Sequence, residues 1–321
     1  MLVITALLAH ALLLGQPLAQ RLARAHWVSR HPRAALRLWH ACAVGMLASV
    51  GGSLVLVAHD LWEHGVVWLF HADKPLVHAA YGGAWQARGI AEAALLVLFA
   101  AALGLSAVGA RRFWRLRRVR DRHRLTADAQ GVYDSIADTS VRVLTHQNPA
   151  AFCIPGPRGR ARIVVTTAAR DLLSPAELAA TVAHERAHLR MRHHRAILAA
   201  DVLTAAIGWT GLMKPYAEQV RRLAELAADD QAVLGHGRRT VASALLEMCS
   251  TASPDVTGTL AMTGPDPAER ICRLIESPPA APARFFRALT ALAAAVVLAT
   301  PAVIALGPAL PLANTAHLPP S

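Results

Sequence analysis

The sequence predicts a mainly α-helical membrane protein, in which four transmembrane helices accompany an inserted α+β domain. The chain has 321 residues, of which 54% are hydrophobic and 17% are charged, whereas ordinary globular domains are about 45–50% apolar. Four apolar runs have roughly the 20-residue length that a bilayer-crossing helix needs. The net charge is +12, and the basic residues cluster beside these runs. This pattern favours membrane topology and contact with anionic lipid over direct binding of nucleic acid.

Three of the apolar runs come early and predict three transmembrane helices with connecting loops in residues 1–110. The first run, residues 2–19, has no positive charge before it. A retained membrane helix is therefore favoured over a cleaved signal peptide. Residues 38–58 form the clearest span, and residues 90–110 form the third.

The charges of the loops predict how these helices are oriented. Residues 21–37 contain five arginines and no acid, and residues 111–120 form the densest cationic block of the chain. The loop between the second and third spans, residues 60–88, is mixed in charge. Because loops rich in Lys and Arg stay in the cytoplasm, we expect a multi-pass protein of the cell membrane. Its N-terminus should lie outside, and the chain from Arg111 onward should be cytoplasmic.

Two sets of potential metal ligands show no clear site pattern. Three histidines of the middle loop recur every seven residues. These residues, His64, His71 and His78, could form a second metal site or a pH-sensing patch, although a plain solvated loop is favoured. The four cysteines have no paired metal spacing, so we expect free thiols; they are Cys42, Cys153, Cys249 and Cys272.

Residues 111–283 are long enough for one domain and carry both helix and strand signals. Residues 125–137 predict a helix, and residues 141–144, 151–154 and 162–167 predict strands. The last of these strands comes shortly before the helix that carries the main motif. It could hold an extended substrate along its edge. It could also be an ordinary strand of the core, and the two interpretations are compatible.

The helix that follows has a strong start signal. Ser174 can cap it, Pro175 suits the first helical position, and Glu177 completes a capping box. No helix breaker occurs between this start and the motif at residues 184–188. The sequence therefore predicts a helix that begins near Pro175 and carries the motif within it.

The motif at residues 184–188 has the pattern H-E-x-x-H. His184 and His188 are four residues apart, so they share one helix face and can bind one metal ion. Neutral imidazole suits zinc, and Glu185 lies where it can take a proton from a metal-bound water. The alternative explanation is two surface histidines on a basic helix.

A second helical stretch downstream can complete such a site. Glu225 can supply a third ligand, and Asp229, one turn later, can hydrogen-bond a ligand imidazole from outside and fix its tautomer. The alternative is a solvated helix face on which both acids pair with Arg221 and Arg222.

The position of Glu225 also constrains the apolar run at residues 196–213. A membrane crossing in this run would place Glu225 on the opposite side from His184, whereas three ligands must converge on one ion. We therefore expect a buried or interface-lying helix that turns back near residues 211–215.

The last part of the chain predicts a return to the membrane. Residues 251–267 are typical of a loop, residues 268–276 of a short basic helix, and residues 278–282 of a proline-rich linker. The fourth transmembrane helix is expected in residues 284–307. The tail at residues 308–321 has no Lys, Arg, Asp or Glu, which suits the outer face.

The chain resembles the BlaR/MecR-type membrane zinc metallopeptidase family. The resemblance rests on three spans, an H-E-x-x-H domain, the sequence E-L-A-A-D from Glu225 to Asp229, and a fourth span. This family is related to the Ste24/HtpX-like peptidases. The resemblance implies a gluzincin-like domain that binds Zn²⁺ through His184, His188 and Glu225. It also implies that Glu185 is the catalytic acid and base, and that Asp229 is an outer carboxylate.

The sequence departs from this family in three places. An acid is usual where His193 stands, a change that we expect to leave the ligands untouched. The family often has His where Gly264 stands, so a catalytic role for residues 264–271, which end in Arg-Ile, is doubtful. Related receptors carry an extracellular penicillin-binding sensor after the fourth span. We expect none here, and a β-lactam trigger is therefore not inferred.

The predicted activity is zinc-dependent endopeptidase cleavage of a cytoplasmic protein, such as a helix-turn-helix transcriptional repressor, with a regulatory purpose. An HtpX-like quality-control protease is one alternative. A non-catalytic, zinc-folded membrane receptor or scaffold is another, although such a protein would not need Glu185.

Overall fold

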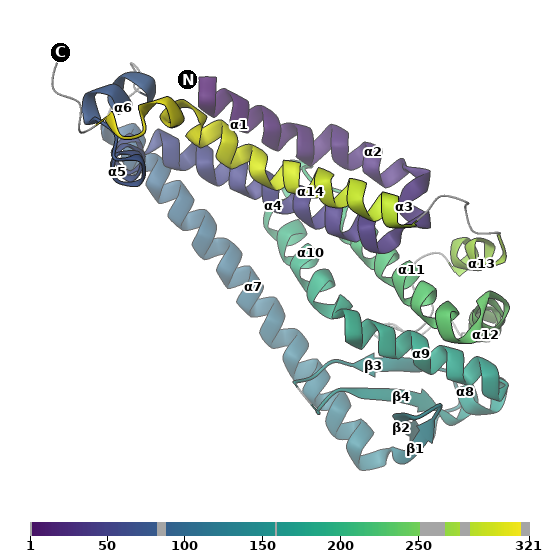
Figure 1. Ribbon diagram of the computed structural model, residues 1–321. Coiled ribbons are helices and arrows are strands. Elements are labelled where there is room, and N and C mark those ends of the chain that lie inside the picture. Colours follow the sequence, from purple (N-terminus) through teal and green to yellow (C-terminus); the bar gives the residue numbers. More distant parts are fainter. Residues whose placement is uncertain (1, 82–87, 158, 251–266, 277–282, 316–321) are drawn as a thin grey trace.

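The computed structural model describes residues 2–81, 88–157, 159–250, 267–276 and 283–315 (Figure 1). Within these residues, four helical stretches are long and apolar enough to cross a membrane. They are Leu2–Arg24, Pro32–Val57, Gly89–Gln130 and Arg284–Leu312. Their number and order agree with the four predicted spans, and they suggest a membrane protein. The sidedness predicted from the basic loops stays a prediction.

The first candidate span is not a uniform α-helix. It consists of α1 (Leu2–Leu13), a π-helical turn η1 (Leu14–Leu18) that contains Pro17, and α2 (Ala19–Arg24). Proline removes one backbone donor from the helix and disturbs its hydrogen-bond ladder. At this turn the carbonyl oxygen of Gly15 accepts a hydrogen bond, 2.7 Å long, from the backbone N–H of Met213. The irregular turn is therefore a docking point for another segment of the chain.

Three of the candidate spans pack into one bundle, with the short helix α3 (His26–Arg30) leading from the first to the second. Helix α4 (Pro32–Val57) packs against both α1 and α14 (Ala283–Leu306), which also contact each other, and α14 continues into η3 (Gly307–Leu312). Figure 1 shows both chain ends at the end of this bundle farthest from the sheet. In chain order the four candidate spans therefore alternate in direction, and α4 and α14 both run toward the end that carries the chain termini.

The middle loop is more regular than expected. It folds into α5 (His59–Phe70) and α6 (Lys74–Tyr81), which cap the far end of the bundle. The prediction of a plain loop is wrong here, because the apolar residues of this segment bury against the first and last spans. His78 Nδ1 lies 3.5 Å from a carboxylate oxygen of Glu63. Among the described residues, His64, His71 and His78 form no metal-binding group.

Helix α7 (Arg88–Gln130) is 43 residues long and runs without a break from the third candidate span into the sheet domain. The expected domain boundary between residues 110 and 111 therefore falls inside one helix. The helix predicted at residues 125–137 is wrong after Gln130. Gly131 ends the helix, and the alternating segment that follows pairs as strand β1 (Val132–Ile136).

The described part of the domain contains a four-stranded sheet in the order β1-β2-β4-β3. The predicted strands are confirmed as β2 (Thr139–Leu144), β3 (Ala151–Ile154) and β4 (Arg162–Thr166). Strand β4 pairs in parallel with β2 and antiparallel with β3. It is therefore an interior strand of the core, and the edge beside the following helices belongs to β3. The expectation of a free substrate-binding edge at residues 162–167 is wrong.

The helices that follow cover the sheet and return to the bundle. They are α8 (Thr167–Leu172), α9 (Pro175–Met191), α10 (His193–Ile207), the turn η2 (Gly208–Thr210), α11 (Tyr216–His236), α12 (Arg238–Ser250) and α13 (Pro267–Ile275). Buried side chains of α9 and α12 form one core with the sheet. The predicted loop at residues 251–267 lies outside the described residues except for Pro267, which begins α13. The linker at residues 278–282 also lies outside them.

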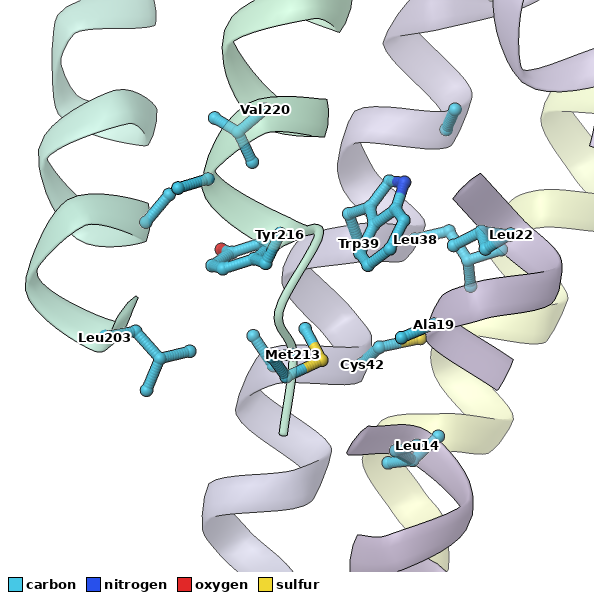
Figure 2. Close-up of a cluster of buried hydrophobic side chains, with 14 of the residues drawn as sticks. Leu14, Ala19, Leu22, Leu38, Trp39, Cys42, Leu203, Met213, Tyr216 and Val220 are labelled. Carbon is cyan, nitrogen blue, oxygen red and sulfur yellow. The ribbon is translucent and has the colours of Figure 1, made fainter. Parts of the chain in front are cut away.

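The apolar run at residues 196–213 turns back as predicted. Gly211 and Met213 adopt positive φ angles of 77° and 52°, and α11 then returns beside α10 (Figure 1). Figure 2 shows Met213 and Tyr216 packed toward Cys42 and Trp39 of α4. This second core fixes the α10–α11 hairpin against the bundle. Helices α10 and α11 are thus anchored to the candidate membrane helices.

Candidate metal centre

The helix that carries the motif begins where the sequence predicts. Ser174 and Glu177 form a complete capping box, in which the Ser174 backbone N–H donates to the Glu177 carboxylate over 2.9 Å. Pro175 occupies the first helical turn, and Ser243 of α12 donates a further hydrogen bond to Glu177. Helix α9 therefore has a fixed start and a fixed rotation against α12.

The side chains of His184, His188 and Glu225 meet at one point between α9 and α11. The two Nε2 atoms are 3.0 Å apart, and the Glu225 carboxylate oxygens lie 3.4 Å from His184 Nε2 and 3.5 Å from His188 Nε2. Two ligand atoms bound about 2.0–2.1 Å from a tetrahedral ion lie about 3.3 Å apart. The spacing and the donor set of two imidazoles and a carboxylate therefore fit a zinc ion.

Glu225 and Asp229 of α11 are buried, so they do not form the solvated face that was the alternative. Glu225 is 6% exposed and Asp229 is fully buried. Arg221 pairs with Asp201 instead, and Arg222 pairs with Glu269. Asp229 Oδ1 lies 2.9 Å from His184 Nδ1. This contact orients the imidazole so that its Nε2 points toward His188 and Glu225.

Arg270 is a part of the site that the sequence analysis left in doubt. This side chain of α13 is 1% exposed. It donates two hydrogen bonds to Asp229, of 2.7 and 2.8 Å, and its Nη1 lies 3.2 Å from Glu225. The signal in the sequence that could have identified this arginine was the Arg-Ile pair at the end of residues 264–271. Gly264 itself lies outside the described residues.

His193 is the second residue that the sequence analysis misjudged. Its Nδ1 lies 3.0 Å from Nδ1 of His188, so the expectation that it would leave the ligands untouched is wrong. Arg192 ends α9 in the left-handed conformation, with φ of 55°. This reversal folds His193 back onto the last turn of α9. Since only one of the two nitrogens can carry the shared proton, the contact fixes how His188 presents its Nε2.

The charges of the site stabilise one another. Burial lowers the pKa of His184, but the carboxylates of Asp229 and Glu225 outweigh it and raise the pKa to about 9. Burial raises the pKa of Glu225, but His184, His188 and Arg270 lower it to about 2. Burial also lowers the pKa of Arg270, and Asp229 reverses this and holds it above its usual value. Burial raises the pKa of Asp229 as well, but Arg270 and His184 hold it below its usual value. Glu225 and Asp229 are therefore ionised at neutral pH and ready to hold a cation.

Burial lowers the pKa of His188 to about 3 and that of His193 to about 4. Both rings are therefore neutral at physiological pH. A neutral imidazole is the form that binds zinc, so His188 needs no proton release before it can act as a ligand.

Glu185 faces a cavity of about 30 Å³ that is also lined by Cys153, His188 and Glu225. A volume of this size holds one or two water molecules. Burial raises the pKa of the Glu185 carboxyl to about 7, so it can both accept and donate a proton near neutral pH. Burial likewise holds the pKa of the Cys153 thiol well above its usual value. All four cysteines lie within the described residues and are free, as predicted.

Residues 115–218 match the model of a family described as Peptidase family M48. The match supports a metallopeptidase. It contains His184, Glu185 and His188 but ends before Glu225, whose place in the site rests on the geometry alone. The M48 match covers less than half of the chain and does not distinguish a BlaR/MecR-type protein from other members. No curated protein and no solved structure matches the chain.

Proposed function

We propose that this protein is a membrane-bound, zinc-dependent endopeptidase. The observation that carries the proposal is the convergence of His184, His188 and Glu225 beside the buried carboxyl of Glu185. The M48 match supports the same class of enzyme. In this proposal the first three residues hold the zinc ion and Glu185 carries out proton transfer.

A zinc ion at this site would lower the pKa of a water molecule toward about 7 and polarise the scissile carbonyl. Glu185 takes the proton of the attacking water and returns it to the leaving amine. Its raised pKa suits both steps, because an acid with a pKa of about 7 exists in both forms at neutral pH. Asp229 and Arg270 hold His184 and Glu225 in place throughout the reaction.

The edge of β3 is the proposed site for an extended substrate. Strand β3 pairs only with β4 among the described strands, and Cys153 of β3 lines the same cavity as Glu185. A peptide that adds to this edge through backbone hydrogen bonds would pass next to the cavity. This arrangement supports cleavage of a protein segment that can be drawn out into a strand.

The predicted cytoplasmic site and a cytoplasmic protein substrate, such as a transcriptional repressor, remain proposals. Two basic segments support the cytoplasmic location of the site: the segment between the first two candidate spans and the cationic block of α7. Both lie toward the sheet end of the bundle, while the chain ends lie at the other end (Figure 1). A basic flank marks the cytoplasmic face, so the peptidase domain would share that face.

The test compares the purified wild-type protein with Glu185→Ala. The variant should keep its zinc, measured by mass spectrometry of the metal, and lose cleavage of an unfolded protein substrate. Glu218→Ala, an exposed change on α11, is the matched control and should behave as wild type. Cleavage by Glu185→Ala at the wild-type rate would refute the role of Glu185. Proteomics of cells with either form would then identify the substrate.

A further inference from the structure

A cleft between α7 and α10 is not used by the proposed reaction. Its volume is about 430 Å³, which is within the range of small-ligand sites. One wall carries Arg111, Arg112 and Arg115 of α7, and the other carries Leu198, Asp201 and Ala205 of α10. We propose that this cleft binds the phosphate headgroup of an anionic phospholipid.

The charge of the cleft supports an anionic ligand. Arg111, Arg112 and Arg115 are exposed and form no ion pair with any described residue. Asp201 is the one acid of the described lining, and its carboxylate is already held 2.5 Å from a guanidinium nitrogen of Arg221. The cleft therefore presents three uncompensated cations. Guanidinium groups bind phosphate oxygens through paired hydrogen bonds.

The position of the cleft favours a lipid over a soluble anion. Arg111 directly follows the apolar stretch of the third candidate span. The aromatic residue Trp114, which is 54% exposed, comes one turn later, and such residues gather at the headgroup level of a membrane. Leu198 and Ala205 give the cleft an apolar wall beside its cations. A headgroup with an attached acyl chain matches this combination, and basic pockets between helices at the cytoplasmic side bind such lipids.

The occupant of the cleft would touch the helix that also forms a wall of the active-site cavity. His194 and Ile197 of α10 line that cavity, and Leu198 and Asp201, one turn further along, line the cleft. Binding of a lipid should therefore hold α10 against α7 and raise the thermal stability of the protein. This inference does not depend on peptidase activity.

The experiment measures lipid binding by native mass spectrometry and thermal unfolding of the full chain in detergent. The added probe is phosphatidylglycerol, with phosphatidylcholine and soluble glycerol phosphate as comparison arms. Phosphatidylglycerol should remain bound and raise the unfolding temperature, whereas the other two should do neither. Equal binding of phosphatidylcholine would overturn the headgroup assignment. Equal stabilisation by glycerol phosphate would overturn the lipid assignment.

Two variants and a control locate the binding to the cleft. Arg111→Gln/Arg112→Gln/Arg115→Gln should weaken phosphatidylglycerol binding at least about tenfold, since it removes the three guanidinium groups that can bind the phosphate. Arg117→Gln/Arg118→Gln/Arg122→Gln removes the same charge from the same helix outside the cleft lining and should bind as wild type. If both triple variants lose binding equally, the cleft is not the site.

Ala205→Trp tests the same site without changing the charge. The indole would fill the cleft from α10 and should exclude the lipid while all three arginines remain. Retained binding by a folded Ala205→Trp protein would show that the lipid lies elsewhere.

Discussion

The candidate metal centre and the α7–α10 cleft contain charged groups in opposite arrangements. At the metal centre, Arg270 pairs with both Asp229 and Glu225, and each of these acids also contacts His184. In the cleft, three exposed arginines face one acid that is already paired. Buried charge is costly unless partners satisfy it, whereas cations at a water-exposed edge can remain open. The difference indicates that the charged groups of the metal centre are held in place before any ligand binds, whereas the arginines of the cleft are free to bind one.

The largest test of this comparison removes a metal ligand. Glu225→Ala deletes one of the three ligands, while His184 and Arg270 still share Asp229. We expect loss of stoichiometric zinc, because the remaining two imidazoles cannot close the site, and loss of proteolysis. Metal content after dialysis and cleavage of an unfolded substrate measure both. A variant that keeps one zinc per chain would show that Glu225 is not a ligand.

Arg270 separates buried from exposed charge directly. Arg270→Met leaves two buried carboxylates without their cation and should cost about 3–5 kcal/mol in unfolding free energy. Arg112→Met in the cleft removes an exposed, unpaired cation and should change stability by less than about 0.5 kcal/mol. Denaturant unfolding of both variants is the measurement. Equal effects would remove the distinction between the two regions.

Arg270→Lys refines the same test. Lysine keeps the charge but cannot make the paired hydrogen bonds that the guanidinium makes to Asp229. Its stability should fall between those of the wild type and Arg270→Met. A lysine variant as unstable as the methionine variant would assign the effect to hydrogen-bond geometry alone.

His193 offers a smaller effect at the edge of the site. His193→Ala removes the contact with Nδ1 of His188 and should weaken zinc binding by about 10–100-fold, as loss of an outer hydrogen-bond partner does. His193→Asp restores an acceptor at this position and should recover much of the affinity. Competition with a zinc chelator measures the change. Unaltered affinity in His193→Ala would mean that the contact does not orient His188.

The sequence was most informative where a local pattern determined the structure. The capping box at Ser174 and Glu177 placed the start of α9, and the spacing of His184 and His188 placed both rings on one face. The requirement that Glu225 reach the same ion also predicted the turn near residues 211–215. Each of these follows from a rule that acts over a few residues or from one geometric condition.

Contacts between distant segments could not be read in the same way. Arg270 reaches Asp229 from another helix, across a stretch of chain that no short-range periodicity describes. His193 meets His188 only because Arg192 adopts a left-handed conformation. Strand β4 was correctly predicted as a strand, but its interior place in the sheet was not predicted. Its pairing with β2 and β3 is set by the order of the sheet and not by its own sequence. Tertiary packing decided all three.

A modest effect is expected at the capping box, which is a charged interaction near the surface. Ser174→Ala should cost about 1 kcal/mol in unfolding free energy, as loss of an N-cap does. The hydrogen bonds from Ser174 and Ser243 hold the pKa of Glu177 below its usual value. Its contribution to stability is therefore complete above the unfolded pKa of about 4.5 and is lost as the pH falls through the lower folded pKa. Glu177→Gln should accordingly destabilise the protein at pH 6 and have a smaller effect near pH 3. Urea unfolding at both values tests this, and a cost that is independent of pH would show that Glu177 acts through its shape and not through its charge.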